Sequence, residues 1–388
     1  MNNTRFDFIV IGAGIAGASI AAHLAQRGRV LLLEGEDQPG YHTTGRSAAL
    51  FSTIYGNASV RALSRASRDF LFQPPPGFSD VPLVHPRPTL FFARPEQLAL
   101  LDEARADADV RSATRLLDAA ETGRLLPVFR PGYLGGGMIE DASADMDVHA
   151  LHQGYLRGAR RLGAELVAGR PVQSLVRDGA AWRVRVADGE FQAPIVVNAA
   201  GAWGDVVARA AGVAPVGLRP LRRTAMVIDA PDGMRPNDWP AAIAADESFY
   251  FRPEAGRLLL SPADETPSEP CDAQPDEWDV AVAVDHFERA VGMPVGRVLR
   301  RWAGLRVFTD DRTPVAGFAP DAPGFFWFAG QGGYGIQMAE GLARAGAALA
   351  CNEALPASLI EHGVNLDDLS PARASLHPAA APSNSSHS

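Results

Sequence analysis

Residues 6–34 read FDFIVIGAGIAGASIAAHLAQRGRVLLLE, and this stretch decides the fold. Residues 6–11 are apolar and rich in β-branched side chains, which predicts a buried strand. Apolar side chains recur on one face of residues 18–27, so a helix is predicted there, ending at Gly28. A second buried strand is predicted over residues 30–33. Together they form one strand–helix–strand unit of about 30 residues, the building block of a parallel sheet.

The turn after the first strand carries Gly12, Gly14 and Gly17 in a GxGxxG spacing, and Glu34 follows Gly14 by 20 positions. In this motif Gly12 permits a tight turn, Gly14 lets the backbone approach a pyrophosphate, and Gly17 lets the helix pack on the strand. The pyrophosphate would lie at the unpaired amides of the helix N-terminus, and Glu34 would accept a hydrogen bond from a ribose hydroxyl. The context predicts a dinucleotide site; the alternative is a turn that serves packing alone.

Two glycine-rich segments late in the chain favour FAD over NAD. They read VNAAGAW at 197–203 and WFAGQGGYGIQM at 327–338. A nicotinamide enzyme is expected to carry one compact Rossmann half followed by a catalytic domain. A long dinucleotide threaded between distant glycine-rich loops fits FAD better. The second segment predicts a strand, a loop and a helix from about residue 336, whose N-terminus would face the flavin. The alternative for residues 330–335 is a simple helix entry.

Several further elements are predicted from apolar patterning and from Pro and Gly breaks. Helices are predicted over residues 61–72 and 147–162. Strands are predicted over residues 89–93, 181–186, 195–198, 224–229, 249–251, 258–260 and 324–329.

Composition excludes several classes of protein. The chain has 388 residues and a net charge of −9, so no basic surplus is present to neutralise nucleic-acid phosphates. All 36 basic residues are arginines, which excludes a Schiff base and a P-loop lysine. Cys271 and Cys351 suggest neither a disulfide framework nor a metal site. No apolar run is long enough to span a membrane and no signal peptide is recognised, so a cytoplasmic location is expected.

Several motifs resemble the FAD-dependent D-amino-acid oxidase superfamily, and within it the bacterial D-arginine dehydrogenases most. They are FDFIVIGAGIAGAS with LLLEGE, QPGYHTTGRSAAL, VNAAGAW, RWAGLR and GQGGYGIQ. The resemblance covers nearly the whole chain. It implies an α/β fold with a Rossmann-like FAD-binding domain and an inserted substrate-binding domain carrying a mixed or antiparallel sheet. The expected FAD-binding domain comprises residues 1–88, 148–200 and 302–368, the substrate domain 89–147 and 201–301, and the last 20 residues, 369–388, form a disordered tail.

The resemblance also implies the residues of the site. The catalytic candidates are Tyr55, Arg223, Tyr250 and Arg306, which hold the substrate carboxylate, and Gly333, whose carbonyl accepts from the substrate amine. The substrate-pocket candidates are Leu50, Phe51, Thr89, Ile336 and Gln337. The cofactor-binding candidates are Gly12, Gly14, Ile15, Ala16, Gly17, Glu34, His42, Thr43, Thr44, Arg46, Ser47, Ala48, Val172, Gly201, Trp203, Gly332, Tyr334 and Gly335.

An arginine is well suited to hold a carboxylate, because its guanidinium offers a planar fork of donors. For Arg306 the alternative role is a structural salt bridge. Arg223 has a neighbour, Arg222, that competes for the same assignment. In a strand the two side chains point to opposite faces, so only one of them can line the site.

The reaction implied by the resemblance is oxidation of a D-α-amino acid. A hydride leaves Cα for flavin N5, and water hydrolyses the resulting imino acid to a 2-oxo acid and ammonia. FAD is expected to be non-covalent, since no cysteine lies between residues 272 and 350. The electron acceptor stays open between oxygen, a quinone and another molecule. Two alternatives also stay open: a glycine or sarcosine type amine oxidase, and a flavin-bearing electron-transfer subunit without its own turnover.

The side-chain pocket departs from the family it resembles. D-arginine dehydrogenases have an acidic residue at the position of Thr89 and a histidine at that of Leu50, next to Phe51. Without that carboxylate a buried substrate cation would be unpaired, at a cost of several kcal/mol. The sequence therefore predicts a preference for uncharged D-amino acids. The alternative is that Asp246 or Glu247 supplies the missing charge.

Overall fold

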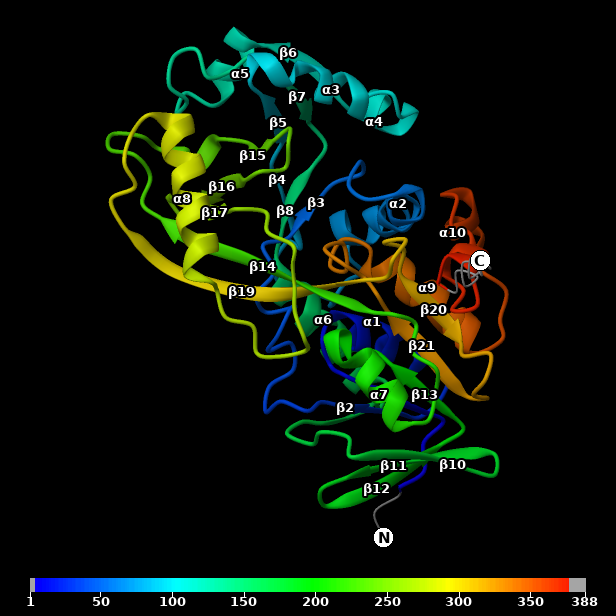
Figure 1. Cartoon of the computed structure of the whole chain (residues 1–388). Helices are drawn as coiled ribbons and strands as arrows, with labels where there is room; N and C mark the ends of the chain where they lie inside the picture. Colours follow the sequence, from blue (N-terminus) through cyan, green and yellow to red (C-terminus); the bar gives the residue numbers. More distant parts are fainter. Residues whose placement is uncertain (1–3, 377–388) are drawn as a thin grey trace, which may run out of the picture.

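The structure, a computed structural model, describes residues 4–376 and is built on two large sheets. The six-stranded sheet lies in the lower half of Figure 1 and the nine-stranded sheet in the upper half. In the six-stranded sheet β2, β1, β13 and β21 run parallel in the centre, with β9 and the antiparallel β20 at the edges. Its strands are β1 Phe8–Ile11, β2 Val30–Leu33, β9 Glu165–Val167, β13 Ile195–Asn198, β20 Val315–Phe318 and β21 Phe325–Ala329.

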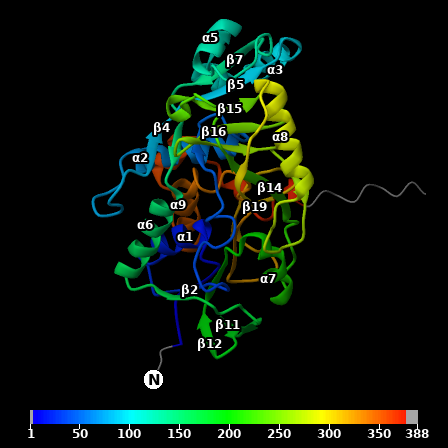
Figure 2. The same cartoon turned by 90° about the vertical axis from the view of Figure 1, so that its left-hand side faces the viewer.

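Alternation along the central strands divides the core into two layers. Phe8 and Val10 of β1 pack in one hydrophobic cluster, whereas Ile9 and Ile11 pack in another on the opposite face. Both faces are covered, which explains why these strands are apolar at every position. Helices α1 Ile15–Leu24, α6 Val148–Arg161 and α9 Ala339–Ala350 cover the first face, and α2 Ala58–Phe72 packs on α9. The second face carries α7 Gly204–Ala210 and the antiparallel hairpins of β10 Ser174–Asp178, β11 Ala181–Val186 and β12 Gly189–Ala193 (Figures 1 and 2).

The nine-stranded sheet combines segments that are far apart in the chain. Its strands are β5 Thr89–Ala93, β6 Arg115–Asp118, β7 Gly136–Glu140, β14 Arg219–Ile228, β15 Ala241–Ala244, β16 Tyr250–Glu254, β17 Arg257–Ser261, β18 Thr266–Pro267 and β19 Val298–Phe308. Helix α8 Glu277–Val291 packs on it through Val280, Ala283 and Phe287. The connection from β5 to β6 contains α3 Leu98–Ala104 and α4 Ala108–Ala113, and α5 Ala119–Leu125 follows β6. A small sheet of β3 Leu50–Phe51, β8 Ala144–Met146 and β4 Val84–Pro86 lies between the large ones.

The predicted fold class is confirmed, and the strands predicted over 89–93, 181–186 and 195–198 coincide with β5, β11 and β13. The domain boundaries stay a prediction. Two elements, β19 and α7, do not follow them. Strand β19 pairs with β14 across the expected boundary at residue 302. Helix α7, expected in the substrate domain, packs instead on the six-stranded sheet.

The predicted disordered tail is wrong for residues 369–376. This segment closes α11 Leu366–Leu369 and forms a short 3-10 turn, Ala374–Leu376. Arg373 within it forms an ion pair with Asp311. The rest of the predicted tail lies outside the described residues.

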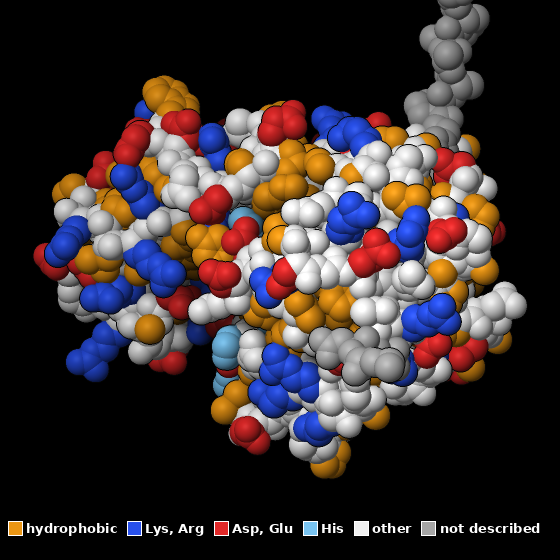
Figure 3. All heavy atoms as spheres, turned by 90° about the horizontal axis from the view of Figure 1, so that it is seen from below, with side chains coloured by type: hydrophobic (Ala, Val, Ile, Leu, Met, Phe, Trp, Pro, Cys, Tyr) orange, Lys and Arg blue, Asp and Glu red, His pale blue; other side chains and the backbone are white. Residues whose placement is uncertain are grey.

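Charged side chains of both signs are interspersed on the face seen in Figure 3. Of the helices within residues 4–376, none combines the length and the apolar character needed to cross a membrane.

Candidate active site

A cavity of about 1180 Å³ extends from the carboxyl ends of β1 and β2 to the nine-stranded sheet. Its volume exceeds that of an ordinary small-molecule pocket, as a dinucleotide together with a substrate would require. All five catalytic candidates line it. So do the cofactor candidates except Gly17 and the pocket candidates except Phe51. The structure therefore brings together residues from every motif that carries the resemblance.

The first glycine turn is shaped for close backbone approach. Gly12 has a φ of +95°, and a Cβ on it would lie 2.5 Å from the Ala199 carbonyl oxygen. A Cβ on Gly17 would lie 1.7 Å from the Gly12 carbonyl oxygen, so Gly17 serves the packing of helix on strand. Gly14 caps α1 and faces the cavity. The turn thus leaves room for a phosphate group at the N-terminus of α1.

The Glu34 carboxylate is held in place at the end of β2. It accepts hydrogen bonds from the amides of Ala13 (2.8 Å) and Glu36 (3.0 Å). A carboxylate has about four acceptor positions, so it can still accept from a ribose hydroxyl. Next to it, His42 Nε2 contacts Glu36 at 2.8 Å, and the His42 ring lies 4.7 Å from that of Trp203. These residues form a polar edge with an aromatic wall on the cofactor side of the cavity.

Arg46 lines the cavity, but its charged end is engaged within the chain. The guanidinium donates to the carbonyls of Ala273 (2.9 Å) and Ala303 (3.1 Å) and forms an ion pair with Asp272. The Arg46 carbonyl accepts from Trp302 Nε1. Arg46 thus fastens the loop of cofactor-binding candidates, residues 42–48, to β19.

Arg306, near the end of β19, is the centre of the candidate anchor for a carboxylate. Its Nη1 donates to the Tyr55 hydroxyl at 3.2 Å. Gly333 lies against it, since a Cβ on Gly333 would be 2.9 Å from Arg306 Cζ. The loop of Gly333 is fixed to β19 by the Gly332 amide, which donates to the Val307 carbonyl at 2.7 Å. Any side chain at position 333 would displace the guanidinium.

The neighbouring arginines of β14 point to opposite faces, and Arg223 is the one on the cavity. Its Nε donates to the Asp264 carbonyl at 2.7 Å, and its Nη2 contacts Glu265 at 3.3 Å. Arg222 instead forms an ion pair with Asp279 at 2.9 Å. The two arginines are therefore distinguished by alternation along the strand.

The electrostatics of this anchor favour an anion. Burial alone would raise the pKa of the Tyr250 phenol, but Arg306, Arg223 and a hydrogen bond with Ser261 outweigh it, so the pKa lies below its ordinary value. Burial would lower the pKa of Arg306, yet Tyr55, Tyr250 and Glu265 hold it above its ordinary value. Two guanidinium charges and two phenol donors converge on one end of the cavity. The Glu265 carboxylate balances part of this charge, and the remaining donors suit a substrate carboxylate.

Phe51 is not a pocket residue, which corrects the sequence prediction. It is fully buried and packs edge-to-face on Phe72, while Leu50 faces the cavity. The reason is alternation along β3, which sends neighbouring side chains to opposite faces. Gln337 lines the cavity and is held by the Ser52 amide and the Ser64 hydroxyl.

A buried acid near Thr89 was missed by sequence analysis. Glu140 of β7 is directly opposite Thr89 of β5 and is 0% exposed. It accepts from the Ser52 hydroxyl (2.6 Å) and from the amide and hydroxyl of Thr53 (both 2.8 Å). Burial raises its pKa despite these hydrogen bonds. The Thr89 hydroxyl is buried and has no hydrogen-bond partner among residues 4–376. No sequence pattern points to Glu140, because only the register of β7 with β5 brings it next to Thr89.

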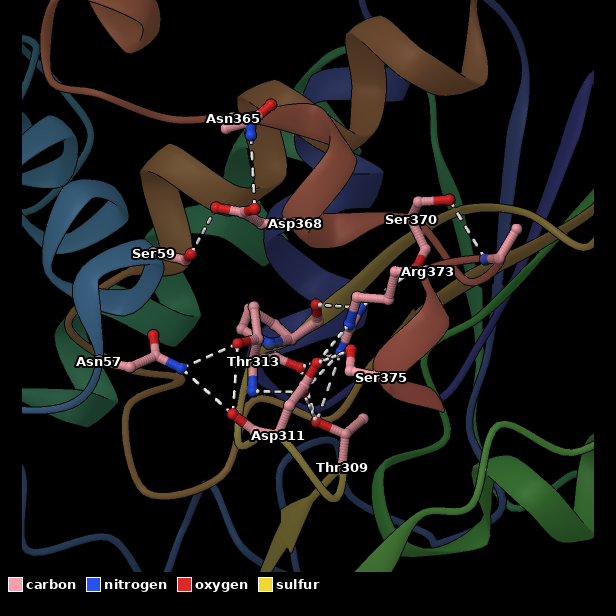
Figure 4. A network of polar contacts seen from close by, with 12 residues as sticks. Asn57, Ser59, Thr309, Asp311, Thr313, Asn365, Asp368, Ser370, Arg373 and Ser375 are labelled. Atoms are coloured by element: carbon pink, nitrogen blue, oxygen red, sulfur yellow. Dashed lines mark hydrogen bonds and ion pairs between the residues drawn. The ribbon is translucent and has the colours of Figure 1, made fainter. Parts of the chain in front are cut away.

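The loop that follows β19 is fastened by the C-terminal segment. Arg373 contacts both oxygens of Asp311, at 2.7 and 2.9 Å, and donates to the Thr313 carbonyl. Asn57, which caps α2, donates to the Thr313 hydroxyl from the other side (Figure 4). Asp311 and Asn57 both line the cavity. This network therefore stabilises one wall of the site.

Arg373→Ala is expected to lower the free energy of unfolding by about 1–3 kcal/mol at pH 7, as for loss of hydrogen bonds to a charged group. Burial would raise the pKa of Asp311, but bonds from Arg373 and Ser375 hold it well below its usual range. This stabilisation is complete above the unfolded pKa of about 3.9 and is lost as pH falls toward the folded pKa. In urea unfolding, the difference in free energy of unfolding between wild type and Arg373→Ala should be smaller at pH 3 than at pH 7. The exposed Arg297→Ala serves as control; an undiminished difference at pH 3 would contradict the account.

Comparison with known proteins identifies the family. The family model described as FAD dependent oxidoreductase matches residues 7–349. The chain belongs to this family. Glycine oxidase of Bacillus licheniformis is 25% identical over 364 residues, covering 86% of this chain and 90% of the relative. Mitochondrial sarcosine dehydrogenase of Homo sapiens is 26% identical over 361 residues, covering 86% of this chain and 38% of the relative.

Solved structures show the same fold. Glycine oxidase from Geobacillus kaustophilus superposes with a TM-score of 0.79 at 22% identity, over 91% of this chain and 96% of the other. L-alpha-glycerophosphate oxidase from Mycoplasma pneumoniae with FAD bound superposes with a TM-score of 0.80 at 16% identity, over 89% and 95%. The solved structures thus show the fold, the family model shows the family, and the closer resemblance to D-arginine dehydrogenases stays a hypothesis.

The cofactor is FAD, and the described residues fit it. Gly12 and Gly17 keep the turn tight, and Gly14 faces the cavity at the N-terminus of α1, where a pyrophosphate would lie. Glu34 and the Gly330–Gly335 loop lie at separate places along the same cavity, as an extended dinucleotide needs. When bound, FAD supplies a two-electron acceptor.

Proposed function

We propose that this flavoenzyme oxidises D-α-amino acids with uncharged side chains to 2-oxo acids and ammonia, through an imino acid. The observation that carries the proposal is the convergence of Arg306, Arg223, Tyr55 and Tyr250 on the end of a cavity that also contains the FAD turn motifs. Such a cluster selects a substrate with a carboxylate. The proposal includes non-covalent FAD, and the acceptor that reoxidises it is a separate question.

Substrate orientation follows from fixation at two points. Arg306 and Arg223 would hold the carboxylate, and the Gly333 carbonyl would accept from the amine. Since Gly333 packs against the Arg306 guanidinium, carboxylate and amine sites share one rigid wall. Fixing two groups on Cα decides which face of that carbon is presented for oxidation. An amine that enters neutral needs no strong side-chain base. Loss of the Cα and N hydrogens gives the imino acid, which water hydrolyses.

The side-chain pocket favours uncharged substrates. Thr89 lines the cavity, whereas the nearest buried acid, Glu140, does not: it is 0% exposed and its carboxylate is turned to Ser52 and Thr53. Asp246 bonds to Gln97 and Ser248, and Glu247 is an exposed residue at the cavity rim. A substrate cation deep in the pocket would therefore lie without a counter-charge.

We expect kcat/KM for D-Leu, D-Met and D-Phe to exceed that for D-Arg and D-Lys by about tenfold or more, because an uncompensated charge costs several kcal/mol. Thr89→Glu should raise kcat/KM for D-Arg relative to D-Leu, since the new carboxylate on the cavity wall would supply the missing counter-charge. Steady-state kinetics on this panel provides the measurement. A preference of the wild type for D-Arg would show that the pocket does not favour uncharged side chains. Glu247 would then be the candidate counter-charge.

A second candidate is oxidation of glycine or sarcosine. The names of the relatives from Bacillus licheniformis and Homo sapiens favour it. Product analysis separates the two functions. Incubation with D-Leu should yield 4-methyl-2-oxopentanoate and ammonia in equal amounts, detected as the hydrazone and by an ammonia assay. Glyoxylate formation from glycine or sarcosine at a higher kcat/KM would replace the proposal by this second candidate.

A further inference from the structure

The cavity continues from the anchor across the sheet toward α3 and α4, where its lining is apolar. We define the apolar arm as Ile54, Leu100, Leu101, Ala104, Val110 and Met138, all of which line the cavity. Leu101 and Val110 are buried, whereas Ala104 is exposed at the outer end. None of these six residues belongs to a motif of the sequence, and none carries a charge.

The strand register places this arm across the sheet from the anchor residue Tyr250. Tyr250 of β16 pairs with Ile243 of β15, Ile243 pairs with Phe91 of β5, and Phe91 pairs with Met138 of β7. All four side chains line the cavity. They form a row across four strands that runs from the anchor to the arm. Thr89 lies two residues along β5 from this row, about 7 Å from Phe91.

Helices α3 and α4 form a wall of the arm next to this row. They contribute Leu100, Leu101, Ala104 and Val110. Leu101, Val110 and Met138 belong to one hydrophobic cluster, so the helices rest on the sheet through the same side chains that form the arm. The wall is therefore part of the folded core.

Charged contacts hold these helices in place relative to the anchor. Arg61 of α2, which is 9% exposed, contacts Asp107 at 2.6 Å and donates to the Gly56 carbonyl at 2.9 Å. Gly56 directly follows Tyr55, which bonds to Arg306. Asp107 caps α4. One buried guanidinium thus links the helix that closes the arm to the loop that carries an anchor residue.

We propose that the apolar arm receives the distal part of an extended, apolar substrate side chain, so that the preferred substrates are D-amino acids with long alkyl side chains. This inference rests on the proposed function, because the anchor must hold the carboxylate for the side chain to run across the sheet from Tyr250 toward Met138. Burial of each added methylene contributes about a fourfold increase in binding. The matching property of the arm is its extension across the sheet away from Tyr250, together with the lack of charge on its six residues.

The test is a chain-length series with two matched variants of α3. The substrates are D-alanine, D-norvaline, D-norleucine and D-2-aminooctanoic acid. For wild type, kcat/KM should rise about fourfold per methylene along the series. Ala104→Trp fills the outer end of the arm, whereas Asp102→Trp puts the same bulk on an exposed position that does not line the cavity. The ratio of kcat/KM for D-2-aminooctanoic acid to that for D-alanine should fall at least about tenfold in Ala104→Trp and stay at the wild-type value in Asp102→Trp.

The outcomes distinguish the arm from the function on which it rests. Oxidation of D-amino acids with no dependence on chain length would overturn the arm and leave the proposed function intact. An unchanged ratio of kcat/KM for D-2-aminooctanoic acid to that for D-alanine in Ala104→Trp would likewise overturn the arm and leave the proposed function intact. If no member of the series bleaches the flavin anaerobically, both proposals fail.

Discussion

Arg306→Ala is expected to lower kcat/KM for D-amino acids about 30-fold to several thousand-fold. This corresponds to a loss of about 2–5 kcal/mol of transition-state stabilisation. The guanidinium is the shared partner of the cluster: it donates to Tyr55, packs against Gly333, and its charge lowers the pKa of Tyr250. Its removal would leave a substrate carboxylate without its planar fork of donors. Stopped-flow reduction of the flavin and steady-state kinetics give the measurement.

Two controls make this result specific. Arg306→Lys should recover little activity, because an ammonium cannot form the bidentate contact. Arg223→Ala should also be damaging, whereas Arg222→Ala should keep kcat/KM near wild type, since Arg222 pairs with Asp279 away from the cavity. Turnover by Arg306→Ala near the wild-type level would remove this residue from the substrate site.

Gly14→Val is expected to give a folded, colourless protein that does not retain FAD. Gly14 faces the cavity at the N-terminus of α1, so a branched side chain would occupy the space of the pyrophosphate. The fold should survive, because the nearest atom to a Cβ there is the end of a side chain, Thr44 Oγ1 at 3.1 Å. Flavin absorbance and the FAD released by acid precipitation measure retention of the cofactor. Circular dichroism measures whether the protein is folded.

The matched control is Gly17→Val. A Cβ at this position would lie 1.7 Å from the Gly12 carbonyl, so the strand and helix could not pack and the fold itself should be lost. Wild type should be yellow and release FAD in place of FMN. A yellow Gly14→Val protein with bound FAD would show that the pyrophosphate lies elsewhere.

The parts of the fold that the sequence predicted depend on local patterns. Residues 30–33 are apolar throughout because both faces of β2 are covered, and that run is visible in the sequence. The helix after the glycine turn begins at Ile15, earlier than the predicted residue 18, because Gly14 caps it and Thr44 accepts from the Ile15 amide. Thr44 is distant in sequence, so this start could not be found locally.

What the sequence did not predict depends on contacts between distant segments. Glu140 reaches the site only through the register of β7 with β5. Phe51 and Leu50 look equivalent as apolar neighbours, and only the position of β3 decides which one faces the cavity. Arg373 looked like part of a low-complexity tail, since its partner Asp311 lies 62 positions earlier. The domain limits and the roles of individual site residues stay predictions.

Anaerobic reduction of the bound flavin by the two enantiomers of leucine, by glycine and by sarcosine decides between the proposed function and its alternative. The purified yellow protein is mixed under nitrogen with D-Leu, L-Leu, glycine or sarcosine, and the loss of flavin absorbance is followed. The account predicts rapid, complete bleaching by D-Leu, slower bleaching by glycine and sarcosine, and none by L-Leu. Bleaching by glycine or sarcosine faster than by D-Leu, or equal rates for D-Leu and L-Leu, would contradict it.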